Sequence, residues 1–136
     1  MGGGTSVHVV IGGAHNGKRE YVREILAGEQ VEWIEAGACS RLPQSLSGRV
    51  VLAGIESYLS ANHENEETAM EDVFRFVQAA DREKLTIIVT DIGRGIVPAD
   101  PHERWLRDVC GRLNQRLFRE AGRITRIWYG LAQELK

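Results

Sequence analysis

The sequence is poor in cysteine, proline and lysine, with two, three and three of these residues among 136. Cys39 and Cys110 have neither the spacing of metal ligands nor enough partners for a disulfide framework, so we expect two reduced cysteines that serve in packing. No apolar run approaches the roughly 18 residues of a membrane-spanning helix. The glycine-rich start lacks the charged and apolar segments of a secretion signal. These absences predict a cytoplasmic location without membrane attachment.

A surplus of charge is also lacking, because 17 Lys and Arg stand against 19 Asp and Glu, for a net charge of −2. Such a balance argues against a dedicated nucleic-acid-binding protein. With 43% hydrophobic residues, a chain of 136 residues can bury a core without disulfides or metals. We therefore predict one soluble domain over residues 1–136.

Short apolar, β-branched runs alternate with segments of helical period. Strands are expected at 7–11, 31–34, 50–52, 85–89 and 124–129, and helices at 21–26, 68–80 and 101–118, with a further short helix around 56–61 left open. Thr68 with Glu71 has the spacing of a capping box, and Asp100 before Pro101 is typical of an N-cap. The alternation predicts an α/β fold of P-loop NTPase-like type, with a mainly parallel sheet and helices on both faces.

The first expected strand runs directly into a glycine-rich segment that opens a helix. Its residues Gly12, Gly13, Ala14, His15, Asn16, Gly17 and Lys18 match the phosphate-binding pattern G-x-x-x-x-G-K. Glycines let backbone N–H groups point at phosphate oxygens, while the lysine and the helix N-terminus add positive potential. We predict that this segment, with the adjoining Arg19, binds the phosphates of GTP or ATP. The alternative is a plain glycine-rich turn with an exposed lysine.

The magnesium ligands of such a site are altered here. Arg19 stands where the full motif has a Ser or Thr hydroxyl for Mg²⁺, and a guanidinium cannot ligate a cation. The third strand leads to Ala53 rather than to an acid. Glu56 and Asp91 follow the third and fourth strands, at the edge where open α/β sheets bind ligands. Either is a candidate Mg²⁺ ligand and, with Lys18, a candidate catalytic residue; an Asp91 that caps its own turn is the alternative.

The second half of the chain carries a distinctive combination of segments. Residues 90–98 read Thr-Asp-Ile-Gly-Arg-Gly-Ile-Val-Pro, and the next expected helix contains Arg-Asp at 107–108 and Asn-Gln at 114–115. In these segments the sequence resembles the adenosylcobinamide kinase / adenosylcobinamide-phosphate guanylyltransferase family of cobalamin biosynthesis. The resemblance extends to the phosphate loop and to residues 31–36 and 129–131. It implies a homotrimer that phosphorylates adenosylcobinamide and then transfers GMP from GTP onto that phosphate.

The resemblance also implies roles for individual residues. Asp91 takes the place of an acid in the family's N-E-V-G segment. The adjoining turn would be shaped by Gly93, Gly95, Val97 and Pro98, and the helix signature would consist of Arg107, Asp108, Asn114 and Gln115.

Departures from the family pattern fall on reactive positions. The family's GMP-accepting histidine lies between the second and third strands, whereas residues 37–49 contain no histidine, and His8, His15, His63 and His102 lie elsewhere. We therefore predict a shortened, divergent member that carries out kinase-type transfer with Mg²⁺ and not guanylyl transfer. The alternative is a non-catalytic relative that binds a nucleotide or a corrinoid as a regulatory or assembly module.

Overall fold

The computed structural model describes residues 7–13, 17–43, 48–62, 66–91 and 100–136. Along the chain these form β1 (His8–Gly12), α1 (Lys18–Ile25), β2 (Val31–Glu35), η2 (Ala36–Ala38), β3 (Arg49–Ala53), α2 (Ile55–Ala61), α3 (Glu66–Ala79), η4 (Arg82–Lys84), β4 (Leu85–Thr90), α4 (Pro101–Glu120), β5 (Arg123–Trp128) and β6 (Leu131–Glu134). The short helix left open around 56–61 is α2. No helix in these ranges is long and apolar enough to cross a membrane.

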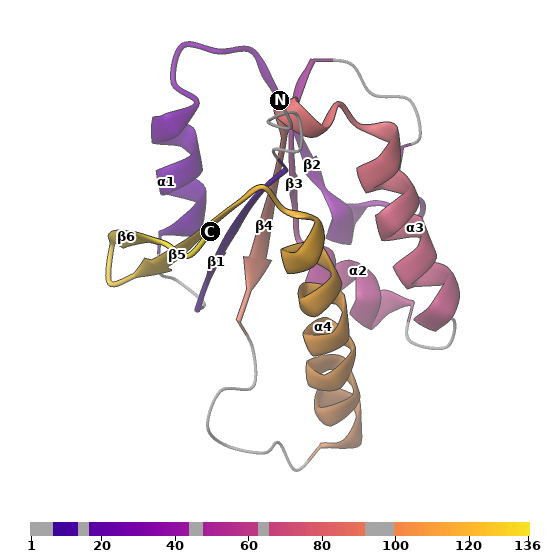
Figure 1. The fold of residues 1–136 in the computed structure, drawn as a ribbon. Coiled ribbons are helices and arrows are strands. Elements are labelled where there is room, and N and C mark those ends of the chain that lie inside the picture. The colour runs from indigo at the N-terminus through magenta and orange to yellow at the C-terminus, as the bar shows by residue number, and fades with distance from the viewer. Residues whose placement is uncertain (1–6, 14–16, 44–47, 63–65, 92–99) are drawn as a thin grey trace.

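Six strands form one sheet in the order β2-β3-β4-β1-β5-β6. The first five are parallel, and only β6 runs antiparallel to its neighbour β5. Helix α1 lies on one face, and α2, α3 and α4 lie on the other (Figure 1). The predicted α/β class, with a mainly parallel sheet covered on both faces, is confirmed. Because the parallel strands end together, residues that follow them meet at one edge of the sheet.

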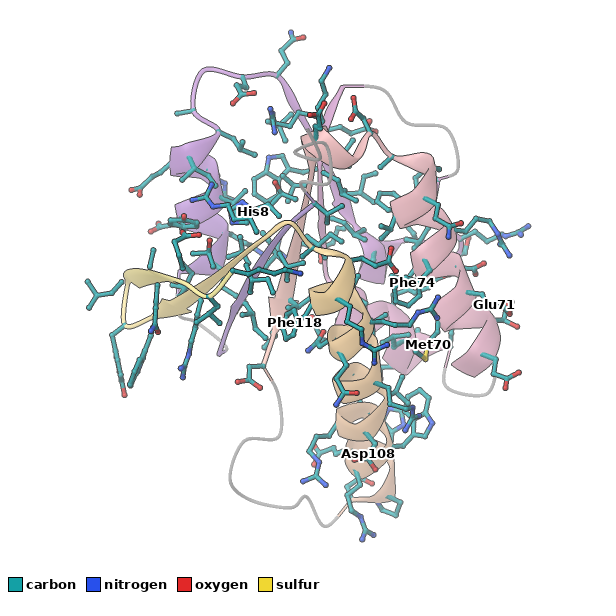
Figure 2. The ribbon with its side chains drawn as sticks, viewed as in Figure 1. His8, Met70, Glu71, Phe74, Asp108 and Phe118 are labelled. Carbon is teal, nitrogen blue, oxygen red and sulfur yellow. The ribbon has the colours of Figure 1, made fainter. Side chains whose placement is uncertain are left out.

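The larger hydrophobic core lies between the sheet and helices α2, α3 and α4, and the smaller one lies under α1. Strand β4 is buried from Leu85 to Val89, which explains why these residues, Thr86 excepted, are apolar. Phe74 is buried in the larger core, and Met70 and Phe118 pack against it from α3 and α4 (Figure 2). Cys110 is buried, as expected of a packing cysteine.

Helix α4 begins and ends close to where the sequence predicts. The Asp100 carboxylate accepts the backbone N–H of His102 at 3.3 Å, and Pro101 is the first helical residue. Val109, Cys110, Leu113 and Leu117 form its buried stripe. The helix ends at Glu120, two residues before Gly122.

Two expectations were wrong. The capping box at Thr68 does not form the start of α3, because the helix already begins at Glu66. The strand over 124–129 was also expected to be the last strand of the sheet, but β6 follows it. All residues of β6 are exposed, so its sequence has no alternation of apolar and polar residues. Tyr129 and Gly130, with φ of 53° and 76°, form the tight turn between the two strands.

Candidate functional site

A cavity of about 420 Å³ opens where β2, β3 and β4 end and where α1 and α2 begin. Its described lining residues are Gly17, Lys18, Arg19, Glu20, Glu35, Gly54, Glu56, Ser57, Ile88 and Thr90. Four residues singled out from the sequence, Gly17, Lys18, Arg19 and Glu56, are therefore brought together. The cavity lies at the carboxyl edge of the sheet, where ligands of open α/β folds bind.

Lys18 is the buried cation of this cavity, with only 8% of its surface exposed. It is the first residue of α1, directly after Gly17, whose φ is 83°. Its Nζ donates to the carbonyl of Gly13 at 2.6 Å. Burial lowers the pKa of Lys18, an effect that nearby Glu56 opposes and Arg19 reinforces. The ammonium group is thus held between the glycine segment and an acid.

Gly12 is the last residue of β1, and Gly13 follows it in the glycine segment. A Cβ on Gly12 would lie 2.6 Å from the carbonyl oxygen of Ile127 on β5, so a side chain does not fit there. The remaining predicted loop residues, Ala14, His15 and Asn16, lie outside the described residues.

Glu56 is the acid that faces Lys18. It lies in the first turn of α2, and its Oε2 accepts the backbone N–H of Thr90 at 2.9 Å. Burial raises the pKa of Glu56, while the Thr90 hydrogen bond and the charge of Lys18 act in the opposite direction. A carboxylate in this position lacks part of its solvation, and a bound cation would supply it.

Arg19 cannot act as a metal ligand. It forms an ion pair with Glu35 at 2.8 Å, and both side chains are about half exposed. Sequence reasoning missed Glu35. The signal was present, because Glu35 ends β2 beside Ala53 in the strand register. The rule that selected Glu56 and Asp91, a carboxylate following a parallel strand, selects Glu35 as well.

Asp91 does not line this cavity. Its backbone N–H donates to the carbonyl of Gly12 at 2.8 Å, which keeps the residue beside the end of β1. The structure thus groups Glu56 with Lys18 and places Asp91 beside them at the same edge. The turn residues Gly93, Gly95, Val97 and Pro98 lie outside the described residues.

The helix-signature residues lie on α4, outside the cavity. Arg107 Nε and Asp108 Oδ1 are 3.6 Å apart, and the Asp108 side chain is exposed (Figure 2). Asn114 is half-buried and Gln115 is exposed.

The cavity can accommodate a metal only together with a ligand. Within the described ranges, no three His, Cys, Asp or Glu side chains form a metal cluster. Mg²⁺, however, commonly takes one or two carboxylates and fills its shell with phosphate oxygens and water. Glu56 fits as that carboxylate, because Glu35 already neutralises Arg19.

The sheet and the position of the glycine–lysine segment at the start of α1 define a P-loop NTPase-like α/β protein. The family model of cobinamide kinase / cobinamide phosphate guanyltransferase matches residues 45–135. The chain therefore belongs to this family. A curated relative, the bifunctional adenosylcobalamin biosynthesis protein CobU of Salmonella typhimurium, is 32% identical over 73 residues. That match covers 52% of this chain and 40% of the relative, so it extends over less than half of the relative's length.

Proposed function

We propose that this chain binds a nucleoside triphosphate, ATP or GTP, at Gly12–Lys18 and transfers its terminal phosphoryl group to a hydroxyl of adenosylcobinamide. The observation that carries the proposal is the presence of Lys18 and Glu56 in one cavity at the start of α1. A buried cation for phosphate oxygens and a half-buried carboxylate for Mg²⁺ are two charged groups that phosphoryl transfer needs. The family's name, which includes cobinamide kinase, supports a cobinamide as the phosphoryl acceptor.

Each residue has a separate task in this reaction. Lys18 exchanges its hydrogen bond to Gly13 for the phosphate oxygens and stabilises their negative charge. Glu56, held by the Thr90 N–H, would supply one oxygen ligand for Mg²⁺. The ion, when bound, neutralises charge on the transferred group. Transfer joins the acceptor oxygen to the γ-phosphorus and breaks the bond between the γ-phosphorus and the bridging oxygen, which leaves with the nucleoside diphosphate. The proton of the acceptor hydroxyl is released to water.

Guanylyl transfer is left out of the proposal. Residues 37–49 contain no histidine that could accept GMP in the way the resemblance implies. We expect intact-mass analysis to find no covalent label on the protein after prolonged incubation with labelled GTP. A covalent GMP adduct would contradict this prediction.

A second candidate function is binding without turnover. The Arg19–Glu35 pair favours it, because Arg19 occupies the place of the hydroxyl that holds Mg²⁺ in a complete motif. In this case the protein would bind a nucleotide or a corrinoid as a regulatory or assembly module. Nucleotide binding without diphosphate release would support this reading.

A diphosphate-release assay with adenosylcobinamide, Mg²⁺ and either ATP or GTP tests the proposal. We expect release that depends on both Mg²⁺ and the acceptor. Lys18→Ala should lower the rate by about 100-fold or more, because it removes the buried cation. Glu32→Gln is the matched control, since Glu32 is exposed on β2 outside the cavity and should leave the rate unchanged. Full turnover by Lys18→Ala would refute the kinase assignment.

A further inference from the structure

A second cavity, of about 350 Å³, lies between the segment after η2 and helices α2 and α3. Its lining includes Ser40, Arg41, Tyr58, Thr68, Asp72 and Arg75, none of which lines the first cavity. The two cavities lie on different sides of α2. Glu56 faces the first and Tyr58 the second, and residues two apart on a helix point about 200° away from each other.

Asp72 holds two of the lining side chains in place. Its Oδ2 accepts the hydroxyl of Tyr58 at 3.0 Å, and its Oδ1 accepts Nη1 of Arg75 at 2.9 Å. Burial and Asp72 together raise the pKa of Tyr58 to about 12, so the hydroxyl keeps its proton at neutral pH. The carboxylate is thus occupied on both oxygens and has a cation beside it, which reduces its repulsion of an anion in the cavity.

Arg41 is the side chain in this cavity whose charge is uncompensated. The residue is exposed, and no hydrogen bond or ion pair joins its side chain to another residue of the described ranges. With Arg75 and Asp72 paired, Arg41 leaves the lining with an excess of one positive charge. Ser40 and Thr68, two hydroxyl-bearing residues from different segments, line the same space.

We propose that this second cavity binds the phosphate group of a small molecule, with Arg41 as its main cation and Ser40 and Thr68 as hydroxyl donors. A guanidinium forms charge-assisted hydrogen bonds with phosphate, and hydroxyls from other directions suit the remaining oxygens of a tetrahedral group better than a planar carboxylate. The volume exceeds the needs of a bare phosphate and leaves room for the group that carries it. The site is separate from the proposed nucleotide site and does not depend on it.

A titration with inorganic phosphate followed by backbone amide NMR reads the two sites separately in one sample. We expect the amide signals of Ser40, Arg41 and Thr68 to move with a dissociation constant of their own. Arg41→Gln should weaken this binding by about tenfold or more, since it removes a charge-assisted contact, while leaving any shifts at 17–19 unchanged. Arg119→Gln, a change at an exposed arginine of α4 outside the cavity, should have no effect.

Each other outcome overturns a defined part of the proposal. If the amides of Ser40, Arg41 and Thr68 do not move, or move equally in Arg41→Gln, the cavity is not a phosphate site. If acetate moves the same amides with equal affinity, the preference for phosphate is wrong. Shifts at the second cavity without shifts at 17–19 would instead count against the proposed nucleotide site and leave this one intact.

Discussion

Gly54 joins β3 to α2 in a conformation that suits glycine, with φ of 76°. A Cβ there would also collide with the Glu35 carboxylate. We expect Gly54→Ala to lower the free energy of unfolding by about 1–2 kcal/mol from the left-handed backbone alone, and further through displacement of Glu35. Urea unfolding monitored by circular dichroism measures the change.

Gly111 provides the matched control on α4. A Cβ at Gly111 meets nothing within 4 Å, and the residue lies in an exposed helix interior. Gly111→Ala should therefore raise the free energy of unfolding by about 0.5–1 kcal/mol. If both substitutions have the same sign, the account of Gly54 is wrong.

At the level of single residues, the sequence predicted the types of side chain at the site. It predicted less well which of these side chains lie close together. Glu56 and Asp91 were both candidates, with Asp91 favoured, because both follow a parallel strand. Their separation depends on details that the sequence does not display: Glu56 is held by the N–H of Thr90, whereas Asp91 is tied through its own backbone to Gly12. Glu35 also ends a parallel strand, but the sequence does not show that it forms an ion pair with Arg19 at the start of α1.

The cap of α4 is the clearest local signal among the helices. Asp100→Ala removes the acceptor for the N–H of His102 and should cost about 1 kcal/mol in the free energy of unfolding. Gln115→Ala, on the exposed face of the same helix, should change it by a few tenths at most. Thermal and urea unfolding measure the free energy of unfolding of both variants. Equal values for the two variants would show that the Asp100 cap contributes nothing to stability.

A polar network fastens the terminal hairpin to β1. His8 Nε2 lies 2.8 Å from Thr125 Oγ1, which donates to Glu134, and Glu134 pairs with Arg123 at 3.0 Å. Burial, reinforced by Arg123, lowers the pKa of His8 to about 4, although Glu134 opposes the shift. The ordinary histidine value is 6.5, so between pH 6.5 and 4 the unfolded chain binds more protons than the folded one.

The free energy of unfolding should therefore fall as the pH is lowered from 6.5 to 4, with His8 contributing at most about 3 kcal/mol. The Glu134 carboxylate adds to the loss at the acid end, because Arg123 lowers its pKa. In His8→Gln the decline through this window should be shallower. Unfolding curves at several pH values test it, with pH above 7 as the reference where His8 is neutral in both states. An unchanged slope in the variant would refute the assignment to His8.

Elements with a buried pattern were predictable, and elements without one were not. β4 and α4 have continuous or periodic apolar residues because each packs against the core. β6 is held by pairing with β5 and by the Glu134 network rather than by burial. The sequence of β6 therefore has no alternation of apolar and polar residues from which the strand could be predicted. The start of α3 was predicted wrongly because Thr68 and Glu71 have the spacing of a capping box by coincidence, whereas the helix begins two residues earlier, at Glu66.

For the whole molecule, strand order brings the site together. β1 lies at the centre of the sheet, and the chain passes from it to β2, β3 and β4 on one side and to β5 and β6 on the other. The glycine segment after β1 thus starts at the point where the strand order reverses, and the acids that follow β2 and β3 reach the same cavity. The single domain over residues 1–136 and the homotrimer stay predictions.

The most direct test of the account is calorimetric titration with ATP and with GTP, each with and without Mg²⁺, of the wild-type protein and of Glu56→Gln. The glutamine keeps an oxygen for the Thr90 N–H but removes the charge that would hold the ion. We predict that Mg²⁺ tightens nucleotide binding to the wild type and has little effect on the variant. Wild-type binding that is the same with and without Mg²⁺, or no binding of either nucleotide, would contradict a phosphoryl-transfer site built on Lys18 and Glu56.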